Sequence, residues 1–261
     1  MSLSKTNIQK YLQKKDTSYK IFDIKYTEKE KKAINNFKIE NEISFYYYGK
    51  FNENTLLKEK YNDKKNILNF ISNIGNNSNK DIQTIKDIIY KLLEKVTKSY
   101  NKDYILLEIR ISLPNKYFDI TRWHFDGYEN QSKFVTLLKG PSTLFIDDKD
   151  IKSKKIYFEI DDKKSKETNK NGIKIKELIK IDDKYRKILA KKLKDAKIVQ
   201  PNNNQGAIFL TDLPKNIDKS VIHNKLVAIH SEPINNNPRF FISVICGTQY
   251  EINKFADIHD K

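Results

Sequence analysis

The sequence has few of the features that mark a secreted, disulfide-linked or membrane protein. Its single cysteine, Cys246, allows no disulfide within the chain and favours a reducing compartment. Cys246 lies in an apolar stretch, so we expect it in the core. Residues Met1 to Lys15 lack the apolar centre of a secretory signal peptide, and no apolar run reaches the ~18 residues of a membrane span. We therefore expect a soluble, intracellular protein that does not enter a membrane.

Acidic residues are outnumbered by basic ones. The chain has 50 Lys and Arg against 34 Asp and Glu, which gives a formal net charge of +16. Such a charge favours an acidic partner, for example nucleic acid. The lysines are spread over every segment, however, which is typical of a solvated surface rather than a focused binding patch. Nucleic-acid binding stays an alternative that the sequence does not favour.

The first part of the chain predicts mainly helices. The clearest is Asp81 to Tyr100, whose isoleucines, leucines and valine recur at helical spacing opposite lysines. Thr27 followed by Glu30 is a capping-box pattern for a helix to Phe37. Further helices are expected over Lys64 to Ile74 and, as a short helix or a loose arm, within Met1 to Lys20. Glu42 to Tyr48 is the one strand expected in this part.

From about residue 103 the apolar pattern changes to that of strands. The expected strands are Tyr104–Leu113, Lys133–Leu138, Ser142–Ile146, Gly206–Leu210, Val221–His230 and Phe240–Cys246. Asp147 to Lys170 is charged and low in complexity, so we expect an insertion or a ribbon with a mobile tip. Leu178 to Ala196 predicts a basic helix. Many short strands after a helical part indicate an α+β protein with a sandwich or a barrel.

A motif that could bind a metal follows the first of these strands. His124 and Asp126 stand two residues apart in an extended segment, so their side chains point to the same side. Trp123 and Phe125 would face the other way and anchor the segment in the core. Two ligands hold a transition metal poorly, and His230 is the best third ligand. Two histidines and one carboxylate make the facial triad of non-haem Fe(II) oxygenases, which leaves metal positions open.

A cation completes the pattern, because Arg239 follows His230 by nine residues at the head of a strand. The order His-x-Asp, distant His, then Arg resembles the Fe(II)/2-oxoglutarate-dependent oxygenase superfamily over roughly the second half of the chain. The resemblance implies a double-stranded β-helix, which is a jelly-roll or cupin-like barrel. Residues 103–261 would be this core, with a charged insertion at about 147–197. Residues 1–102 would be a helix-rich region that braces one sheet.

The resemblance also implies a reaction. His124, Asp126 and His230 would bind Fe(II), and 2-oxoglutarate would chelate the iron while Arg239 pairs with its far carboxylate. With O2, the products would be succinate, CO2 and a hydroxylated or oxidatively demethylated substrate, whose identity stays open. Many members carry a serine two residues after the arginine. Here Phe241 stands at that position and would line the pocket. Ser243 has the nearest hydroxyl on the same face, so it is the candidate for a second contact to the cosubstrate.

Two other functions remain open from the sequence alone. One is a basic β-barrel that binds nucleic acid, with tyrosines as stacking platforms and Lys149 to Lys197 as an arm. The other is a jelly-roll protein that binds a metal without turnover. Neither His223 nor His259 is assigned to the metal, because His223 would face away from His230 in a continuous strand and His259 lies in a polar tail.

Overall fold

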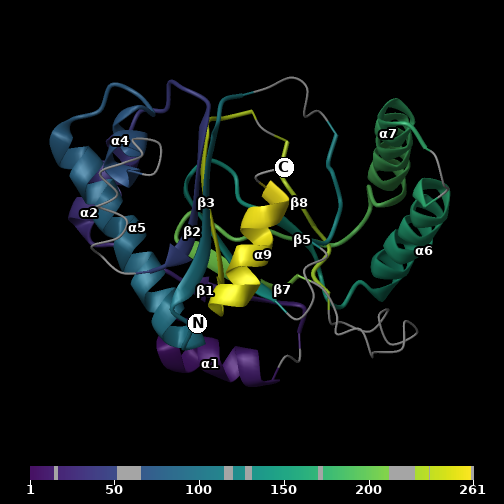
Figure 1. The fold of residues 1–261 in the computed structure, drawn as a ribbon, viewed down its shortest axis with the longest axis horizontal. Coiled ribbons are helices and arrows are strands. Elements are labelled where there is room, and N and C mark those ends of the chain that lie inside the picture. Colours follow the sequence, from purple (N-terminus) through teal and green to yellow (C-terminus); the bar gives the residue numbers. More distant parts are fainter. Residues whose placement is uncertain are drawn as a thin grey trace.

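Two antiparallel sheets form the centre of the computed structural model of this chain (Figure 1). The structure describes residues 1–14, 17–51, 66–114, 120–126, 131–169, 173–211, 227–234 and 236–259, and the side chains among them up to residue 255. Within these residues, the helices are too short or too polar to cross a lipid bilayer.

The larger sheet has six strands in the order β1-β7-β4-β9-β3-β2. Their bounds are β1 Tyr19–Asp23, β7 Gln205–Leu210, β4 Ser132–Lys139, β9 Arg239–Gly247, β3 Tyr104–Ser112 and β2 Ile43–Lys50. β9 lies in the middle and is buried along its whole length, as its run of apolar residues requires. Its register on β3 places Phe241 opposite Arg110, and Arg239 opposite Ser112. Cys246 of β9 is in the core as expected.

The smaller sheet has three strands in the order β6-β5-β8, with bounds β6 Ile198–Val199, β5 Leu144–Ile146 and β8 His230–Ser231. An isolated antiparallel bridge between His124 and His230 extends it by one more segment. The mixed helices and antiparallel sheets agree with the expected α+β class. In the part of the chain that the structure describes, the two sheets do not close into a barrel, so the double-stranded β-helix stays a prediction.

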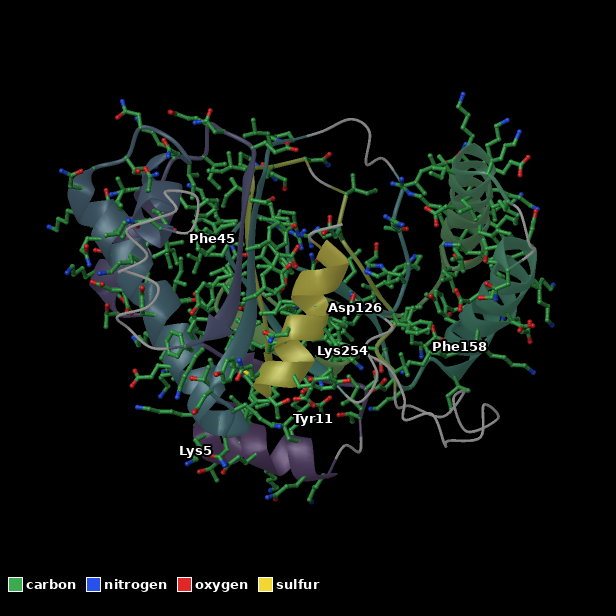
Figure 2. The ribbon with its side chains drawn as sticks, in the orientation of Figure 1. Lys5, Tyr11, Phe45, Asp126, Phe158 and Lys254 are labelled. Atoms are coloured by element: carbon green, nitrogen blue, oxygen red, sulfur yellow. The ribbon has the colours of Figure 1, made fainter. Side chains whose placement is uncertain are left out.

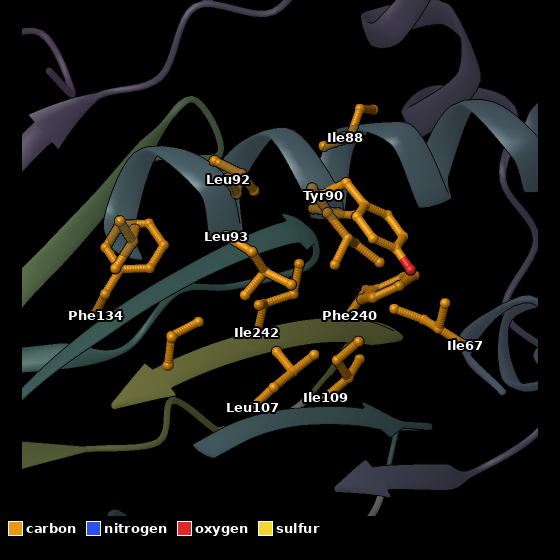
Figure 3. Packing of buried hydrophobic residues seen from close by; sticks show 14 of the residues in the cluster. Ile67, Ile88, Tyr90, Leu92, Leu93, Leu107, Ile109, Phe134, Phe240 and Ile242 are labelled. Carbon is orange, nitrogen blue, oxygen red and sulfur yellow. The ribbon is translucent and has the colours of Figure 1, made fainter. Parts of the chain in front are cut away.

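One face of the larger sheet is covered by the helices α1 Lys5–Lys14, α2 Glu28–Asn36, α4 Ile67–Ser72 and α5 Asn79–Tyr100. α5 begins at the N-cap Ser78 and ends at Asn101, whose positive φ of 53° closes the helix. Its apolar stripe packs on β3 and β9, where Leu93, for example, joins one core with Ile109 and Ile242 (Figure 3). The helix expected over Asp81 to Tyr100 is thus confirmed, and so is the capping box of α2.

A helical hairpin stands on the opposite side of the molecule, formed by α6 Ile151–Thr168 and α7 Ile175–Lys192 (Figure 1). The expected ribbon with a mobile tip is therefore wrong. Tyr157 and Ile160 give α6 one apolar face, which packs with Tyr185 and Leu189 of α7 in a second core. Phe158 of α6 lies on the side of the hairpin nearest the strands, 6.3 Å from the ring of Phe125 (Figure 2).

Two further elements differ from the expectation. β1 follows α1 and pairs with β7, where only a helix or a loose arm was expected. The polar C-terminal tail forms the helix α9 Gln249–His259, in which Ile252 is buried. The first six residues of the strand expected over Val221 to His230, among them His223, lie outside the described residues, and only the short strand β8 stands at its end.

Candidate active site

The segment that carries His124 lies beside β8. The backbone N–H of His124 donates to the carbonyl of His230 at 2.9 Å, and the N–H of His230 donates back at 2.8 Å. This reciprocal pair fixes the two residues side by side, with their ring centroids 4.3 Å apart. The segment was expected to be extended, and it meets β8 in this single bridge rather than in a continuous strand.

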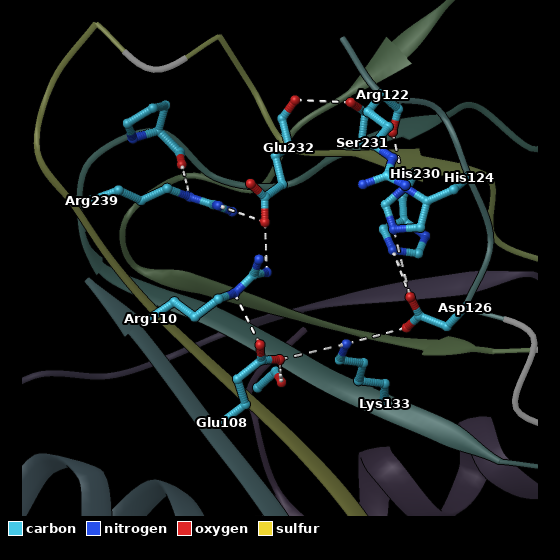
Figure 4. A network of polar contacts seen from close by, with 12 residues as sticks. Glu108, Arg110, Arg122, His124, Asp126, Lys133, His230, Ser231, Glu232 and Arg239 are labelled. Carbon is cyan, nitrogen blue, oxygen red and sulfur yellow. Dashed lines mark hydrogen bonds and ion pairs between the residues drawn. The ribbon is translucent and has the colours of Figure 1, made fainter. Parts of the chain in front are cut away.

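Asp126 completes a group of three. Its Oδ1 lies 3.6 Å from Nε2 of His124 and 3.5 Å from Nε2 of His230 (Figure 4). One ligand atom from each residue lies within 4.8 Å of the others, which is close enough to surround one metal ion. The structure thus brings together the three residues singled out in the sequence.

The tautomer of each histidine follows from the hydrogen bond that its Nδ1 makes. Nδ1 of His124 contacts the carbonyl of Arg122 at 2.9 Å, and Nδ1 of His230 contacts that of Ala228 at 3.1 Å. A carbonyl only accepts, so each Nδ1 carries the proton and each Nε2 of a neutral ring presents a lone pair. Two lone pairs and a carboxylate oxygen then face one another with no donor between them. A bound cation satisfies all three, which is the arrangement of metal-ligating histidines held by backbone carbonyls.

The electrostatics of the group agree with this assignment. Burial and the neighbouring His230 lower the pKa of His124 to about 4, so its ring is neutral at physiological pH. Burial alone would raise the pKa of Asp126, but the positive charge of a protonated His230 and that of Lys133 outweigh it and hold the pKa below its ordinary value, so the carboxylate favours a cation beside it. Lys133 of β4 lies 3.2 Å from Oδ2 of Asp126. The carboxylate is therefore ionised, as a metal ligand must be.

Trp123 and Phe125 alternate with His124 and Asp126 along this segment. Both pack in the second core with the α6–α7 hairpin, Trp123 with only 6% of its surface exposed. The expected anchoring of the aromatic pair in a core is confirmed, and both rings also line the cavity that His124 and Asp126 line. This explains why the hairpin matters to the site, since it supports the segment that carries two of the three residues.

Arg239 lies at the other end of the same cavity and is 4% exposed. Its Nε donates to the carbonyl of Pro141 at 3.1 Å, and Nη1 lies 3.4 Å from Glu232. Its buried Nη2 has no hydrogen-bond partner among the described residues. Burial lowers the pKa of Arg239 to about 10, against the opposing effect of Glu232, so the side chain remains a cation. A buried guanidinium with an unused donor fits a carboxylate ligand.

Phe241 and Ser243 follow Arg239 on the same face of β9, and both line the cavity. The ring of Phe241 lies under the guanidinium of Arg239, 4.7 Å from it. Phe241 therefore lines the pocket as expected. The hydroxyl of Ser243 donates to the carboxylate of Glu108 at 3.0 Å, so this hydroxyl is engaged within the protein.

Several charged residues in the cavity received no role from the sequence, and four of them lie between the triad and Arg239 (Figure 4). They are Glu108, Arg110, Lys133 and Glu232, which form one network with Asp126 and Arg239 (Figure 4). Glu108 and Arg110 stand two residues apart within the apolar run of β3. Charged residues at this spacing in a buried strand indicate a polar interior face, and this signal was available in the sequence.

The cavity that joins these groups has a volume of about 710 Å³. Its walls come from the sheet on one side, with Tyr46 and Glu108, and from the hairpin on the other, with Tyr157, Tyr185 and Arg186. A volume of this size suits a small cosubstrate together with part of a second molecule.

Comparisons with known proteins give structural similarity only. No protein-family model and no curated protein matches the chain. Among solved structures, a Kdo hydroxylase described as a non-heme Fe(II) alphaketoglutarate-dependent dioxygenase in complex with cobalt(II) has a TM-score of 0.44 and 9% identity, over 95% of this chain and 86% of that one. A Pseudomonas putida prolyl-4-hydroxylase has a TM-score of 0.39 and 7% identity, over 94% and 98%.

A prolyl hydroxylase from Trichoplax adhaerens, in complex with a hypoxia inducible factor peptide fragment, has a TM-score of 0.37 and 6% identity, over 96% of this chain and 91% of that one. All three scores lie below 0.5.

Proposed function

We propose that the chain is an Fe(II)- and 2-oxoglutarate-dependent dioxygenase that hydroxylates or oxidatively demethylates its substrate. The observation that carries the proposal is the convergence of two imidazole Nε2 lone pairs and one carboxylate oxygen at one end of a cavity, with a buried arginine at the other. The core would be a double-stranded β-helix over residues 103–261, with the α6–α7 hairpin as its insertion. Residues 1–102 would brace it.

In this proposal His124, Asp126 and His230 hold the iron. Three protein ligands on one side leave the remaining positions for cosubstrate and O2. The carbonyls of Arg122 and Ala228 keep the two rings in the ligating tautomer, and Lys133 holds the second oxygen of Asp126. The iron and 2-oxoglutarate supply the oxidising chemistry, with succinate and CO2 as coproducts, and the protein supplies position and charge.

Arg239 binds the far carboxylate of 2-oxoglutarate. Its Nη2 is a buried donor that the described residues leave unused, and a guanidinium binds a carboxylate with two parallel hydrogen bonds. Phe241 holds the guanidinium from below. Ser243 is the proposed second polar contact on this face, once its hydroxyl turns from Glu108. Burial of this end of the cavity excludes water from the ion pair and strengthens it.

The substrate would share the cavity with the cosubstrate, on the side that Tyr157 and Tyr185 of the hairpin line. Its chemical class is left open by the proposal.

The test is turnover of the cosubstrate. Wild-type protein with Fe(II), 2-oxoglutarate and O2 should form succinate, even slowly and without substrate, whereas Asp126→Ala should form none. Asp183→Asn is the matched control, because it removes an aspartate from the exposed face of α7, where Asp183 pairs with Lys187. Iron binding by wild-type protein without any succinate would indicate a metal-binding protein and contradict the proposal.

A further inference from the structure

The carboxylate of Glu232 lies between two arginines. Its Oε1 is 2.6 Å from Nη2 of Arg110 and 3.4 Å from Nη1 of Arg239 (Figure 4). Both guanidinium groups also lie over the ring of Phe241, at 4.8 Å and 4.7 Å. Two strands and one loop segment thus build one anion-binding site: β3 and β9 supply the cations, and the segment after β8 supplies the anion.

The two arginines hold this carboxylate unequally. Arg110 makes the short contact and also has an ion pair with Glu108 at 3.1 Å, so two carboxylates balance its charge, although its Nε has no hydrogen-bond partner among the described residues. Arg239 has only the long contact to Glu232, a backbone carbonyl and one unused buried donor. A planar guanidinium can hold a carboxylate with two short hydrogen bonds, and the contacts described for Arg239 use only part of this capacity.

In the ion pair between Glu232 and Arg239, Glu232 is the side chain that can move away more easily. Its side chain is 41% exposed, whereas that of Arg239 is 4% exposed. The carboxylate of Glu232 can move away from Arg239 at little cost in free energy, because water already reaches it. Moving Arg239 would expose a buried cation and break its bond to Pro141.

We propose that Glu232 is a resident competitor for the arginine pair Arg110 and Arg239, and that a carboxylate from outside displaces it from Arg239. Arg110 keeps Glu232 in place beside the incoming group. The ligand class is a small dicarboxylate, with one carboxylate on Arg239 and the other toward the triad. That 2-oxoglutarate is this ligand rests on the proposed function, whereas the carboxylate chemistry follows from the arginine pair itself.

The charges predict the sign of the effect. Arg110 and Arg239 are balanced by Glu108 and Glu232, so the site is neutral as it stands. Glu232→Gln removes one negative charge and the competing ligand while the side chain keeps its size. An external carboxylate should then bind more tightly. If Glu232 instead only held the arginines in position, the same substitution would weaken binding.

The experiment uses glutarate, which has the two carboxylates of 2-oxoglutarate but no keto oxygen for metal chelation. Isothermal titration of the metal-free full-length chain should show Glu232→Gln binding glutarate about tenfold more tightly than wild type, equivalent to about 1.4 kcal/mol. Glu42→Gln is the matched control, since Glu42 lines the same cavity but has no ion pair to Arg239 among the described contacts. Its affinity for glutarate should change less than twofold.

Equal or weaker glutarate binding by Glu232→Gln overturns the inference, and so does an absence of glutarate binding in both proteins. Glu232→Ala is the second variant, in case the first folds poorly by circular dichroism, and it must shift the affinity in the same direction. A parallel titration with 2-oxoglutarate, with and without Co(II), separates the two claims. No gain from Co(II) contradicts the proposed function, while the glutarate ratio still decides the role of Glu232.

Discussion

His124 and His230 are 106 residues apart in the sequence, yet their backbones bond to each other in both directions, at 2.9 and 2.8 Å. The bridge sets the distance between the two rings before any metal binds. Each ring is then oriented by a carbonyl two residues upstream, those of Arg122 and Ala228. The chain therefore builds this end of the site from backbone geometry, which does not depend on the metal.

The first prediction concerns the three side chains of the proposed metal site. His124→Ala, Asp126→Ala and His230→Ala should each lose Fe(II) binding, because two remaining ligands hold the ion poorly. Iron retained after loading and desalting measures this, with circular dichroism to check the fold. Asp183→Asn should retain iron like wild type. Near-normal iron affinity in any of the three alanine variants removes that residue from the triad.

The second prediction separates the binding of the cosubstrate from the binding of the metal. Arg239→Ala leaves a carboxylate without its buried cation, at a cost of roughly 3–5 kcal/mol, or a hundred- to several-thousand-fold in 2-oxoglutarate affinity. Arg239→Lys keeps the charge but loses the planar fork. Its affinity for 2-oxoglutarate should therefore lie between those of the wild type and Arg239→Ala. Isothermal titration of metal-loaded protein without oxygen measures both. Iron binding should survive in both variants, and unchanged 2-oxoglutarate affinity would make Arg239 a structural residue.

The third prediction concerns the turn that supports Arg239. Gly140 has a φ of +89°, and a Cβ there would lie 2.5 Å from the carbonyl oxygen of Pro238 and 2.9 Å from Cα of Arg239. Gly140→Ala should therefore lower the free energy of unfolding by about 1–3 kcal/mol and also weaken 2-oxoglutarate binding.

Gly75→Ala is its control, because a Cβ there would lie 2.7 Å from the carbonyl oxygen of Lys38, far from the site. It should reduce stability but leave cosubstrate affinity unchanged. Urea unfolding and titration of both variants give the comparison. Equal losses of 2-oxoglutarate affinity in the two variants would show that Gly140 acts through general stability alone.

The fourth prediction uses the only tryptophan, Trp123, which packs in the hairpin core beside His124. Leu189→Ala should cost about 2–5 kcal/mol by opening a cavity in that core. Emission from Trp123 should shift to the red, and iron affinity should fall, because the segment with His124 loses support. Leu178→Ala, on the same helix but 37% exposed, should change stability by less than about 0.5 kcal/mol. Unaltered emission in Leu189→Ala would contradict the packing.

The fifth prediction concerns pH. His124 has a pKa of about 4 in the folded protein and near 6.5 when unfolded, so the unfolded chain binds more protons between these values. The stabilisation of the metal-free protein from its neutral ring is complete above pH 6.5 and is lost as pH falls through 4. Urea unfolding at pH 7 and pH 5 should therefore show a smaller loss for His124→Gln than for wild type. The same loss in both proteins would rule out this role.

Much of the scaffold could be predicted because its apolar residues are periodic. α5 and the strands β3 and β9 have long, regular patterns, and the structure agrees with all three. The four residues His124, Asp126, His230 and Arg239 could be selected because their types and order are typical of one chemistry. The structure then brought the first three within 4.8 Å.

The parts that were missed depend on partners far along the chain. α6 has few apolar residues, and its core includes α7, Trp123 and residues from distant segments such as Ile146 and Ile229. β1 pairs with a strand almost two hundred residues later, so its own short sequence gives no sign of the pairing. The placement of Arg110 over the ring of Phe241 depends on the register of β3 against β9, which no local pattern contains.

The most direct measurement of the central claim is the visible absorption of the protein with Fe(II) and 2-oxoglutarate under anaerobic conditions. A weak charge-transfer band should appear only when both are present, because the cosubstrate then chelates iron held by His124, Asp126 and His230. The band should be absent in His230→Ala and should need far more 2-oxoglutarate in Arg239→Ala. Iron bound at one equivalent without this band at saturating 2-oxoglutarate would contradict the account.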